Sequence, residues 1–265
     1  MIRTDSRKVR PGDTFAALAG ISSNGSEYIE DAVANGASVI ICQEGISVPA
    51  NVTAVHTSDP RKYLEAVLER EYGPVISQMT LMGVTGTNGK TTTCYLISQA
   101  LNELGIPCAY IGTVGFYLGD LRRDIANTSV DICDLYELLL EAHEHGFDHV
   151  ALEASSQGLD MGRLNTVRFD AAAFTNLTED HLDYHKTMEN YALAKRRLFE
   201  SLKPSGTAVV NADDSYKDHF LGCGLRTLTY GFGSSSEEPA DFQIIDFSTD
   251  PDTGTVLSYM HAGHT

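Results

Sequence analysis

An apolar segment, a glycine-rich turn and a helix-forming segment follow one another between residues 79 and 104. Glycines allow backbone N–H groups to turn toward phosphate oxygens, and the N-terminus of a helix adds a favourable dipole. Lys90 can reach terminal phosphates, and the Thr91 hydroxyl can bind Mg²⁺. We therefore expect a nucleotide phosphate loop rather than an ordinary strand–helix turn. Its residues are Gly86, Thr87, Asn88, Gly89, Lys90, Thr91 and Thr92.

Apolar strand candidates alternate with helix candidates through the rest of the chain. This alternation predicts an α/β fold, with a doubly wound, mostly parallel sheet that is covered by helices. Two apolar segments on either side of the turn at 248–254 predict an antiparallel hairpin. We expect strands at 79–85, 149–155, 171–177 and 207–213, and helices at 91–104, 131–145 and 187–203.

The first 73 residues predict a separate, small α/β unit. Tyr72-Gly73-Pro74 is expected to break a helix and to mark the boundary between two domains, 1–73 and 74–265. Within the first domain we expect a helix at 27–36, a strand at 37–43 and a second helix from residue 60 to about residue 70.

Composition excludes several classes of protein. With 19 Lys and Arg against 36 Asp and Glu, the net charge is −17, so neither nucleic acid nor a membrane surface is expected as a partner. No apolar run reaches the roughly 18 residues of a membrane span, and no signal peptide is visible, which predicts a cytoplasmic protein. Free thiols are expected rather than a zinc site or disulfides, because no CxxC pair occurs among Cys42, Cys94, Cys108, Cys133 and Cys223.

The phosphate loop differs from the common Gly-x-x-x-x-Gly-Lys-Thr pattern, because Val84 stands where that pattern has its first glycine. The shorter form VTGTNGKTTT resembles the ATP loop of the Mur ligase family, whose members use ATP to form amide bonds. Blocks at 150–163 and 174–195, together with Asp5-Ser6-Arg7, resemble the MurE-type branch, the UDP-N-acetylmuramoyl-tripeptide synthetases. The resemblance covers nearly the whole chain and rests on four separated motifs.

The resemblance implies a two-step reaction of peptidoglycan synthesis. ATP would phosphorylate the free γ-carboxylate of the D-glutamate in UDP-N-acetylmuramoyl-L-alanyl-D-glutamate, and the amine of a third amino acid would then attack the acyl phosphate. The first domain would bind the uridine end of this substrate, and the second would bind ATP and Mg²⁺. Diaminopimelate and lysine both remain open as the added amino acid. All partners would be small molecules, and a monomer is expected.

Glu153 and His181 are the first two candidates for metal binding. Glu153 follows an apolar strand, where a carboxylate can hold Mg²⁺ or simply face solvent; the resemblance makes it a magnesium ligand. On a helix, His181 and His185 would share a face and form a conceivable transition-metal pair, although no third ligand is apparent. The resemblance instead assigns His181 to a second Mg²⁺ near the γ-phosphate, and leaves His185 to pack or to form a hydrogen bond.

Lys195 interrupts an otherwise apolar helical face. A lysine in a buried stripe is costly unless it is paired or chemically altered, and the alternative is a side chain that reaches out to solvent. The resemblance implies that Lys195 reacts with CO₂ to form a carbamate, which would bind metal beside Thr91, Glu153 and His181. This needs a neutral amine, and burial lowers a lysine pKa as required. The predicted catalytic residues are Lys90, Glu153, His181 and Lys195.

Polar residues elsewhere are candidates for substrate binding. Asn127-Thr128-Ser129 precedes a predicted helix and reads locally as a cluster of capping residues. The resemblance implies that these residues contact the muramoyl peptide, and it assigns substrate contacts to Ser6, Ser155 and Arg163. Gln157 stands where the family normally has histidine, so no charge is available at that position.

The family is usually longer than this chain at both ends. We expect a fragment with an incomplete ATP-binding domain, without the C-terminal domain that binds the amino acid, and without ligase activity of its own. The alternative is a protein that binds a nucleotide or a UDP-linked substrate and is not a ligase. A third interpretation is a folyl-polyglutamate synthase. The Asp5-Ser6-Arg7 motif argues against it.

Overall fold

The computed structural model forms two compact units. The first comprises Met1–Ile76 and Asp131–Glu141, and the second comprises Ser77–Val130 and Ala142–Thr265. The structure describes residues 1–20, 24–125, 128–222, 226–232, 239–250, 252 and 254–261. No helix within these ranges combines the length and the apolar character that a membrane span requires.

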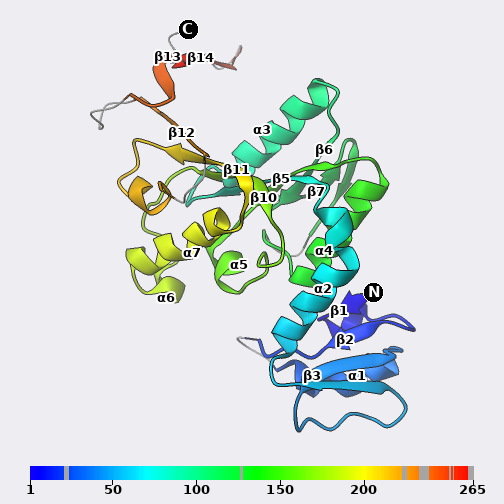
Figure 1. Cartoon of the computed structure of the whole chain (residues 1–265). Coiled ribbons are helices and arrows are strands. Elements are labelled where there is room, and N and C mark those ends of the chain that lie inside the picture. The colour runs from blue at the N-terminus through cyan, green and yellow to red at the C-terminus, as the bar shows by residue number, and fades with distance from the viewer. Residues whose placement is uncertain are drawn as a thin grey trace. The chain divides into compact units, whose positions relative to one another are not determined.

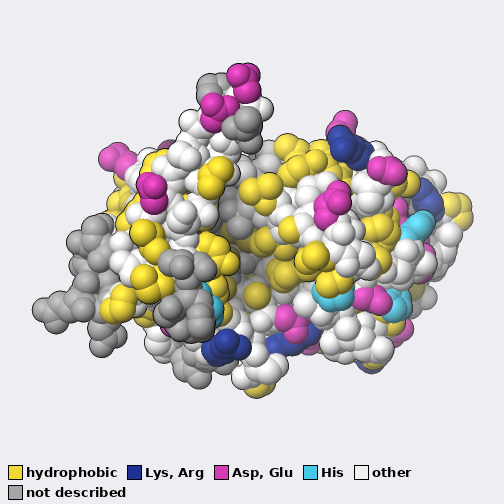
Figure 2. Space-filling model, turned by 90° about the horizontal axis from the view of Figure 1, so that it is seen from above, with side chains coloured by type: hydrophobic (Ala, Val, Ile, Leu, Met, Phe, Trp, Pro, Cys, Tyr) yellow, Lys and Arg dark blue, Asp and Glu magenta, His cyan; other side chains and the backbone are white. Residues whose placement is uncertain are grey.

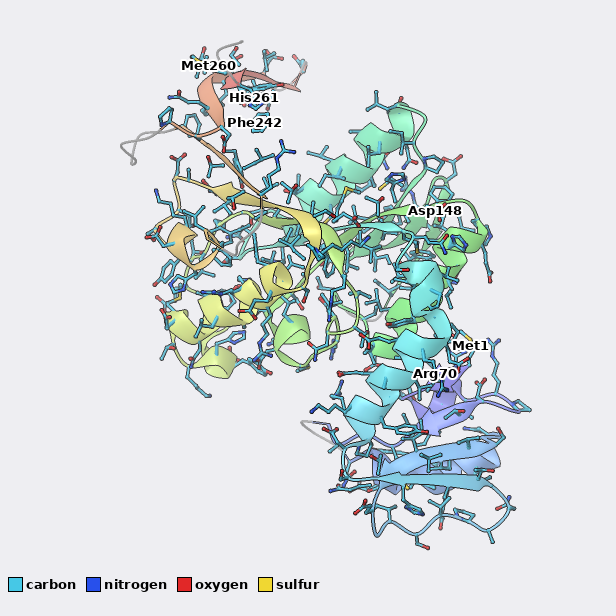
Figure 3. The ribbon with its side chains drawn as sticks, in the orientation of Figure 1. Met1, Arg70, Asp148, Phe242, Met260 and His261 are labelled. Atoms are coloured by element: carbon cyan, nitrogen blue, oxygen red, sulfur yellow. The ribbon has the colours of Figure 1, made fainter. Side chains whose placement is uncertain are left out.

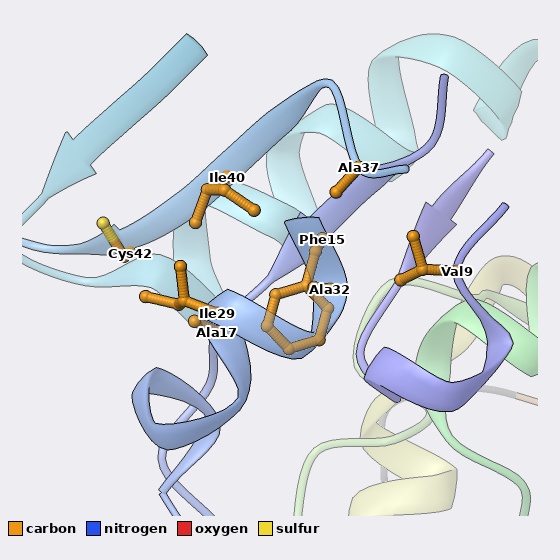
Figure 4. Packing of buried hydrophobic residues seen from close by; sticks show 8 residues of the cluster. All are labelled: Val9, Phe15, Ala17, Ile29, Ala32, Ala37, Ile40 and Cys42. Carbon is orange, nitrogen blue, oxygen red and sulfur yellow. The ribbon is translucent and has the colours of Figure 1, made fainter. Parts of the chain in front are cut away.

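The N-terminal unit is built on a parallel sheet with the strand order β1-β2-β3-β4 (Figure 1). Its strands are β1 Ile2–Arg3, β2 Thr14–Ala16, β3 Val39–Gln43 and β4 Thr53–Thr57. Its helical segments are η1 Ser6–Lys8, η2 Gly25–Tyr28, α1 Ile29–Ala34 and α2 Pro60–Ile76. Figure 4 shows the core in which apolar side chains of the strands, α1 and the segments next to them meet: Val9, Phe15, Ala17, Ile29, Ala32, Ala37, Ile40 and Cys42.

Helix α2 continues through the predicted break at Tyr72-Gly73-Pro74 and ends at Ile76, so the predicted helix end near residue 70 is wrong. Pro74 removes an N–H donor, but only in the last turn of a long helix. Packing holds that turn: Ile76 is buried, and the ring of Tyr72 lies 6.0 Å from that of Tyr136 within the same unit. Tertiary contacts thus outweigh the local break signals. The domain limits of 73 and 74 stay a prediction.

The second unit contains a sheet whose described strands follow the order β14-β13-β12-β11-β10-β5-β9-β6-β7-β8. Neighbouring strands are parallel from β13 through β6, and antiparallel pairs occur at the two ends. The predicted α/β fold with a mostly parallel sheet is therefore confirmed. The strands are β5 Thr80–Thr85, β6 Cys108–Gly112, β7 Gly115–Leu118, β8 Leu121–Arg123, β9 His149–Glu153, β10 Phe169–Phe174, β11 Leu202–Asn211, β12 Arg226–Gly231, β13 Phe242–Asp250 and β14 Gly254–His261.

Helices cover both faces of this sheet (Figure 1). Helix α3 packs on β5, β6 and β9, whereas α7 packs on β5, β10 and β11 on the other face. Strand β5 lies between β9 and β10, so the chain changes direction across the sheet at this strand, and the loops after these three strands meet at one edge. The helical segments after β5 are α3 Lys90–Glu103, α4 Ile132–Glu144, α5 Ser156–Asp160, α6 Leu182–His185, α7 Met188–Glu200 and η3 Lys217–His219, and most of α4 belongs to the first unit.

The predicted C-terminal hairpin is confirmed by the antiparallel pairing of β13 with β14. Phe242 and His261, labelled in Figure 3, stack across the two strands with their ring centroids 4.1 Å apart. Apolar side chains are also visible over much of the face that Figure 2 shows. The exposed large apolar residues of the hairpin are Ile245, Phe247, Val256, Leu257, Tyr259 and Met260.

Candidate active site

The glycine-rich loop connects β5 to α3 and requires glycine at two positions. Gly86 has φ 147° and Gly89 has φ 87°, in the region that favours glycine. A Cβ atom on Gly86 would lie 1.9 Å from Oγ1 of Thr175, so the backbone of the loop approaches the end of β10 more closely than any other residue type allows. Gly89 is the N-cap of α3, which places the helix N-terminus directly after the loop.

The segment after β10 holds the phosphate loop in place through side-chain hydrogen bonds. Thr175 Oγ1 donates to the Asn88 carbonyl at 2.6 Å, and the Asn88 N–H donates to Oδ1 of Asn176 at 3.1 Å. The N–H of Thr178 donates to Oγ1 of Thr87 at 3.0 Å. Because these bonds connect two separate strand ends, the loop keeps its shape by contacts beyond its own sequence.

Two lysines converge on one carbonyl oxygen of the loop. Lys90 Nζ donates to Gly86 O at 3.0 Å and to Thr87 O at 2.8 Å, while Lys195 Nζ donates to Gly86 O at 2.7 Å. Lys195 is only 1% exposed, and its Nζ lies 4.3 Å from the centre of the Tyr191 ring. Burial, and then the nearby charge of Lys90, lowers the pKa of Lys195 well below its usual value. The predicted burial of Lys195 is confirmed, and a side chain that reaches out to solvent is excluded.

The burial of Lys195 predicts a measurable cost to stability. A lysine whose pKa is lowered in the folded state binds fewer protons than in the unfolded chain, so its contribution to the free energy of unfolding rises with pH. We expect Lys195→Met to raise the free energy of unfolding at neutral pH by roughly 1–4 kcal/mol. This gain should shrink as the pH rises toward about 10.4, the pKa of a free lysine.

Denaturant unfolding of parent and variant, at neutral and at alkaline pH and with CO₂ removed, measures this difference. The matched control is Lys62→Met, because Lys62 is exposed on α2. A gain for Lys195→Met that stays the same at both pH values would contradict a desolvated amine.

Glu153 is fully buried at the end of β9 and accepts four hydrogen bonds. Its Oε1 accepts from the hydroxyl of Tyr110 and, at 2.8 Å, from the N–H of Thr113. Its Oε2 accepts from Oγ1 of Thr91 at 2.9 Å and from Oγ1 of Thr113 at 3.1 Å. The carboxylate therefore lies against the first residues of α3, beside the phosphate loop as predicted. The alternative of a carboxylate that faces solvent is excluded.

Three predicted substrate residues gather around Ser129, which is also buried. Ser129 Oγ lies 3.0 Å from Ser155 Oγ and donates to the Glu153 carbonyl at 3.2 Å. Arg163 Nη1 donates to the carbonyl of Ser129 at 2.6 Å. Thr128 is adjacent in the sequence. The structure thus brings these side chains together at the main chain of Glu153.

The two histidines do not form a metal pair. His181 precedes α6 with φ 52°, is half-exposed, and lies 3.5 Å from Asp180 as an ion pair when protonated. His185 is buried, lies 2.9 Å from Oγ of Ser156 and stacks on the Tyr191 ring. The prediction that His181 and His185 share one face of a helix is wrong, because His181 lies outside the helix in a left-handed conformation. The packing and hydrogen-bonding role of His185 is confirmed.

The remaining predicted residues lie at the edge of this arrangement or apart from it. Thr128 Oγ1 is 3.0 Å from Oγ1 of Thr113, so it reaches the Glu153 network through one hydroxyl. Thr92 is exposed on α3. Ser6 is buried in the N-terminal unit, where its carbonyl accepts from Nδ2 of Asn35 at 3.0 Å. Asn127 lies outside the described residues.

Sequence reasoning missed the tyrosines of the site. Tyr191 lies on the apolar and aromatic helical face that Lys195 interrupts, and its ring contacts Lys195, His185 and, edge-on at 6.1 Å, His181. Its place four residues before Lys195 is a signal that such a contact is possible on a helix. Tyr110 carries no comparable signal, because strand pairing alone brings it to Glu153.

The N-terminal unit contains a cavity of about 140 Å³. Polar side chains of Asn24, Ser26, Gln43 and Arg61 contribute to its lining. Nη1 of Arg61 is buried without a hydrogen-bond partner among the residues that the structure describes. The side chains of Asn24, Ser26, Gln43 and Arg61 give this cavity hydrogen-bonding groups that suit a polar ligand.

Comparison with known proteins relates both units to one family. The family model "Mur ligase middle domain" matches residues 84–263, and the model "Mur ligase family, catalytic domain" matches residues 1–82. The UDP-N-acetylmuramoyl-L-alanyl-D-glutamate–2,6-diaminopimelate ligase of Clostridium perfringens is 34% identical and aligns with 94% of this chain and 51% of its own length. The protein of that name from Xylella fastidiosa is 44% identical, over 84% of this chain and 44% of its own length.

Solved structures agree with these matches. A structure of a UDP-N-acetylmuramoyl-L-alanyl-D-glutamate–2,6-diaminopimelate ligase superposes with a TM-score of 0.81 at 32% identity, over 99% of this chain and 54% of that one. MurF ligase from Thermotoga maritima, solved in complex with ADP, shares the fold with a TM-score of 0.67 at 19% identity, over 99% of this chain and 56% of that one. The chain spans about half the length of the curated relatives it matches. Because the middle-domain match alone covers more than half of the 265 residues, the chain belongs to the Mur ligase family.

Proposed function

We propose that the protein is an ATP-dependent ligase of peptidoglycan synthesis, which adds 2,6-diaminopimelate to the D-glutamate γ-carboxylate of UDP-N-acetylmuramoyl-L-alanyl-D-glutamate. The observation that carries this proposal is the convergence of Lys90 and the buried Lys195 on the carbonyl of Gly86, in a chain of the Mur ligase family. The relatives named for this reaction supply the substrate and the amino acid. As these relatives are about twice as long, the activity is proposed for a protein of their length.

The two domains, 1–73 and 74–265, would divide the binding of substrates between them. In the first, the cavity lined by Asn24, Ser26, Gln43 and Arg61 would receive the UDP group, and Ser6 is the residue that we assign to uridine. In the second, the loop from Gly86 to Thr92 would hold the phosphates of ATP, with backbone N–H groups and Lys90 as donors. The remaining substrate contacts are assigned to Asn127, Thr128, Ser129, Ser155 and Arg163.

The residues beside the phosphate loop fit Mg²⁺. Thr91 and Glu153 offer hard oxygen ligands, with Thr91 Oγ1 only 2.9 Å from Glu153 Oε2. We assign His181 to a second Mg²⁺. Its half-exposed ring lies in the segment that directly follows the residues bonded to the phosphate loop. When bound, Mg²⁺ would neutralise charge on the phosphoryl group during transfer. Lys90 adds a positive charge that lies close to Glu153 and Asp180.

Lys195 would contribute to this site as a carbamate. Its neutral amine would attack CO₂ so that an N–C bond forms, one C=O electron pair moves to oxygen, and the nitrogen loses a proton to solvent. The product is an anion with two oxygen ligands in place of a cation. The lowered pKa of the buried amine supports this step, because it raises the neutral fraction. The same change would relieve the repulsion between Lys195 and Lys90.

Substrate binding and turnover test the proposal in separate ways. We expect the 265-residue chain to bind UDP-N-acetylmuramoyl-L-alanyl-D-glutamate in calorimetric titration and to form no tripeptide when ATP and diaminopimelate are added. The reason is that both matched domains are present, whereas the relatives named for ligation are about twice as long. A protein of the relatives' length should release phosphate only when diaminopimelate is present.

Each result of this test decides one point. Amino-acid-dependent turnover by the 265-residue chain would contradict its expected inactivity, and turnover with lysine alone would contradict diaminopimelate. Binding of the UDP-linked dipeptide without turnover at either length would favour a substrate-binding protein that is not a ligase. We also propose a monomer. A cytoplasmic location is proposed because the cysteines that the structure describes are free and buried.

A further inference from the structure

Tyr110 has no part in the proposed reaction, yet its hydroxyl donates a hydrogen bond to Oε1 of Glu153. Tyr110 is completely buried on β6, next to the strand that ends in Glu153. The N–H of Thr113 donates to the same oxygen at 2.8 Å. Oε1 is therefore occupied by two donors whose positions are fixed, one by a packed ring and the other by the main chain.

The other oxygen of Glu153 has partners of a different kind. Oε2 accepts only from hydroxyl groups among the described residues, from Thr91 at 2.9 Å and from Thr113 at 3.1 Å. A hydroxyl can rotate its hydrogen away and offer a lone pair, which a backbone N–H cannot do. A cation can thus approach Oε2 beside Thr91 while both bonds to Oε1 stay intact.

The packing around Tyr110 leaves the carboxylate little room to turn. The Tyr110 ring lies 6.2 Å from that of Tyr95 and 5.3 Å from that of Tyr117, measured between centroids. A Cβ atom on Gly112 would lie 2.1 Å from Oε1 of Glu153 and 2.4 Å from the Tyr110 hydroxyl. The backbone of residue 112 therefore closes the space behind the hydrogen-bonded pair.

We propose that Tyr110 is a positioning residue: its hydroxyl fixes Oε1 of Glu153, so that Oε2 is presented beside Thr91 to the Mg²⁺ that accompanies the nucleotide. The role rests on the proposed function, because it concerns the same metal site. Residues that orient a metal ligand by a hydrogen bond usually contribute about 10- to 100-fold to metal affinity. Without the phenol, Oε1 would lose one of its two fixed donors, and the carboxylate would hold Oε2 less firmly.

The test compares Mg²⁺ binding by the 265-residue chain and two phenylalanine variants. Each protein is saturated with a non-hydrolysable ATP analogue and titrated with Mg²⁺ in a calorimeter. For Tyr110→Phe we expect the affinity for Mg²⁺ to fall by about 10- to 100-fold, while affinity for the analogue without metal stays the same. The control is Tyr95→Phe, which removes a hydroxyl from the ring packed against Tyr110 and leaves every donor to Glu153 that the described residues provide.

A double-mutant cycle separates positioning from packing. In a Glu153→Gln background, Tyr110→Phe should change the affinity for Mg²⁺ by less than about twofold, because the carboxylate through which it acts is gone. An equal loss in both backgrounds, or an unchanged affinity in Tyr110→Phe alone, would overturn the role of Tyr110 and leave the proposed function standing. If neither the 265-residue chain nor a protein of the relatives' length binds nucleotide in a Mg²⁺-dependent way, the proposed function fails and this role fails with it.

Discussion

Lys195→Ala is expected to remove most ligase activity from a protein of the relatives' length and to leave its fold intact. The variant would lose the amine that we propose to become a carbamate, and with it an anionic ligand next to the phosphoryl group. Removal of one preorganised group that stabilises charge in a transition state typically lowers kcat by about 10²- to 10³-fold. The fold should persist because alanine favours helices, and the neighbouring Leu198 and Phe199 remain buried.

Phosphate release in the presence of all substrates measures the activity, and isotope labelling tests the carbamate. The 265-residue chain equilibrated with ¹³C-bicarbonate should show one protein-bound carbamate carbon by NMR, and this signal should be missing from Lys195→Ala. Lys195→Arg should be equally inactive, because it retains a positive charge and arginine stays protonated. The control Lys62→Ala should keep both the activity and the NMR signal, since Lys62 is exposed on another helix.

Acetate distinguishes the proposed metal ligand from a purely structural lysine. A short carboxylate can enter the space that Lys195→Ala leaves and offer oxygen to the metal, so partial recovery of the rate with added acetate is expected. Lys195→Arg should show no recovery, because its side chain fills that space. Near-parental rates in both variants would mean that Lys195 serves packing alone.

The secondary structure that could be predicted from the sequence is the part indicated by hydrophobic periodicity and by the positions of glycine. The strand, the loop and α3 form one local unit, and the apolar face of α7 marks the burial of Lys195 directly. The end of α2 could not be predicted in this way. Gly73 and Pro74 are genuine break signals, and the helix continues because of tertiary packing: Ile76 is buried, and Tyr72 contacts Tyr136, more than sixty residues away in the sequence.

The same distinction applies to the candidate site. Lys90 and Thr91 are local to the phosphate loop, so the motif alone indicates them. The conformation of His181 could not be read from a helical pattern, because its left-handed backbone is set by the turn into α6. Tyr110 reaches Glu153 only because β6 pairs with β9 in a particular register, which no local pattern encodes.

Lys90→Ala is expected to weaken the binding of Mg-ATP by roughly 10- to 150-fold, or about 1.5–3 kcal/mol, the usual range for hydrogen bonds to charged groups. In the structure, Lys90 Nζ is bonded to the carbonyls of Gly86 and Thr87, and bound phosphates would compete for these donor hydrogens. The loop should not unfold in the variant, because Lys195 still donates to Gly86 and the hydrogen bond from Thr175 to the loop remains.

Calorimetric titration of the 265-residue chain with Mg-ATP measures this loss, with Lys62→Ala as the matched lysine variant. The comparison also separates the two lysines that meet at Gly86. If Lys90 contacts the β- and γ-phosphates, its removal should weaken ATP binding more than AMP binding, because AMP lacks both groups. Lys195→Ala should weaken the binding of ATP only when Mg²⁺ is present, since its proposed role is that of a metal ligand, whereas Lys90→Ala should weaken the binding of ATP with and without the metal. Equal affinity of parent and Lys90→Ala for Mg-ATP would contradict the phosphate-loop assignment itself, and with it the placing of Glu153, Thr91 and Lys195 around a transferred phosphoryl group.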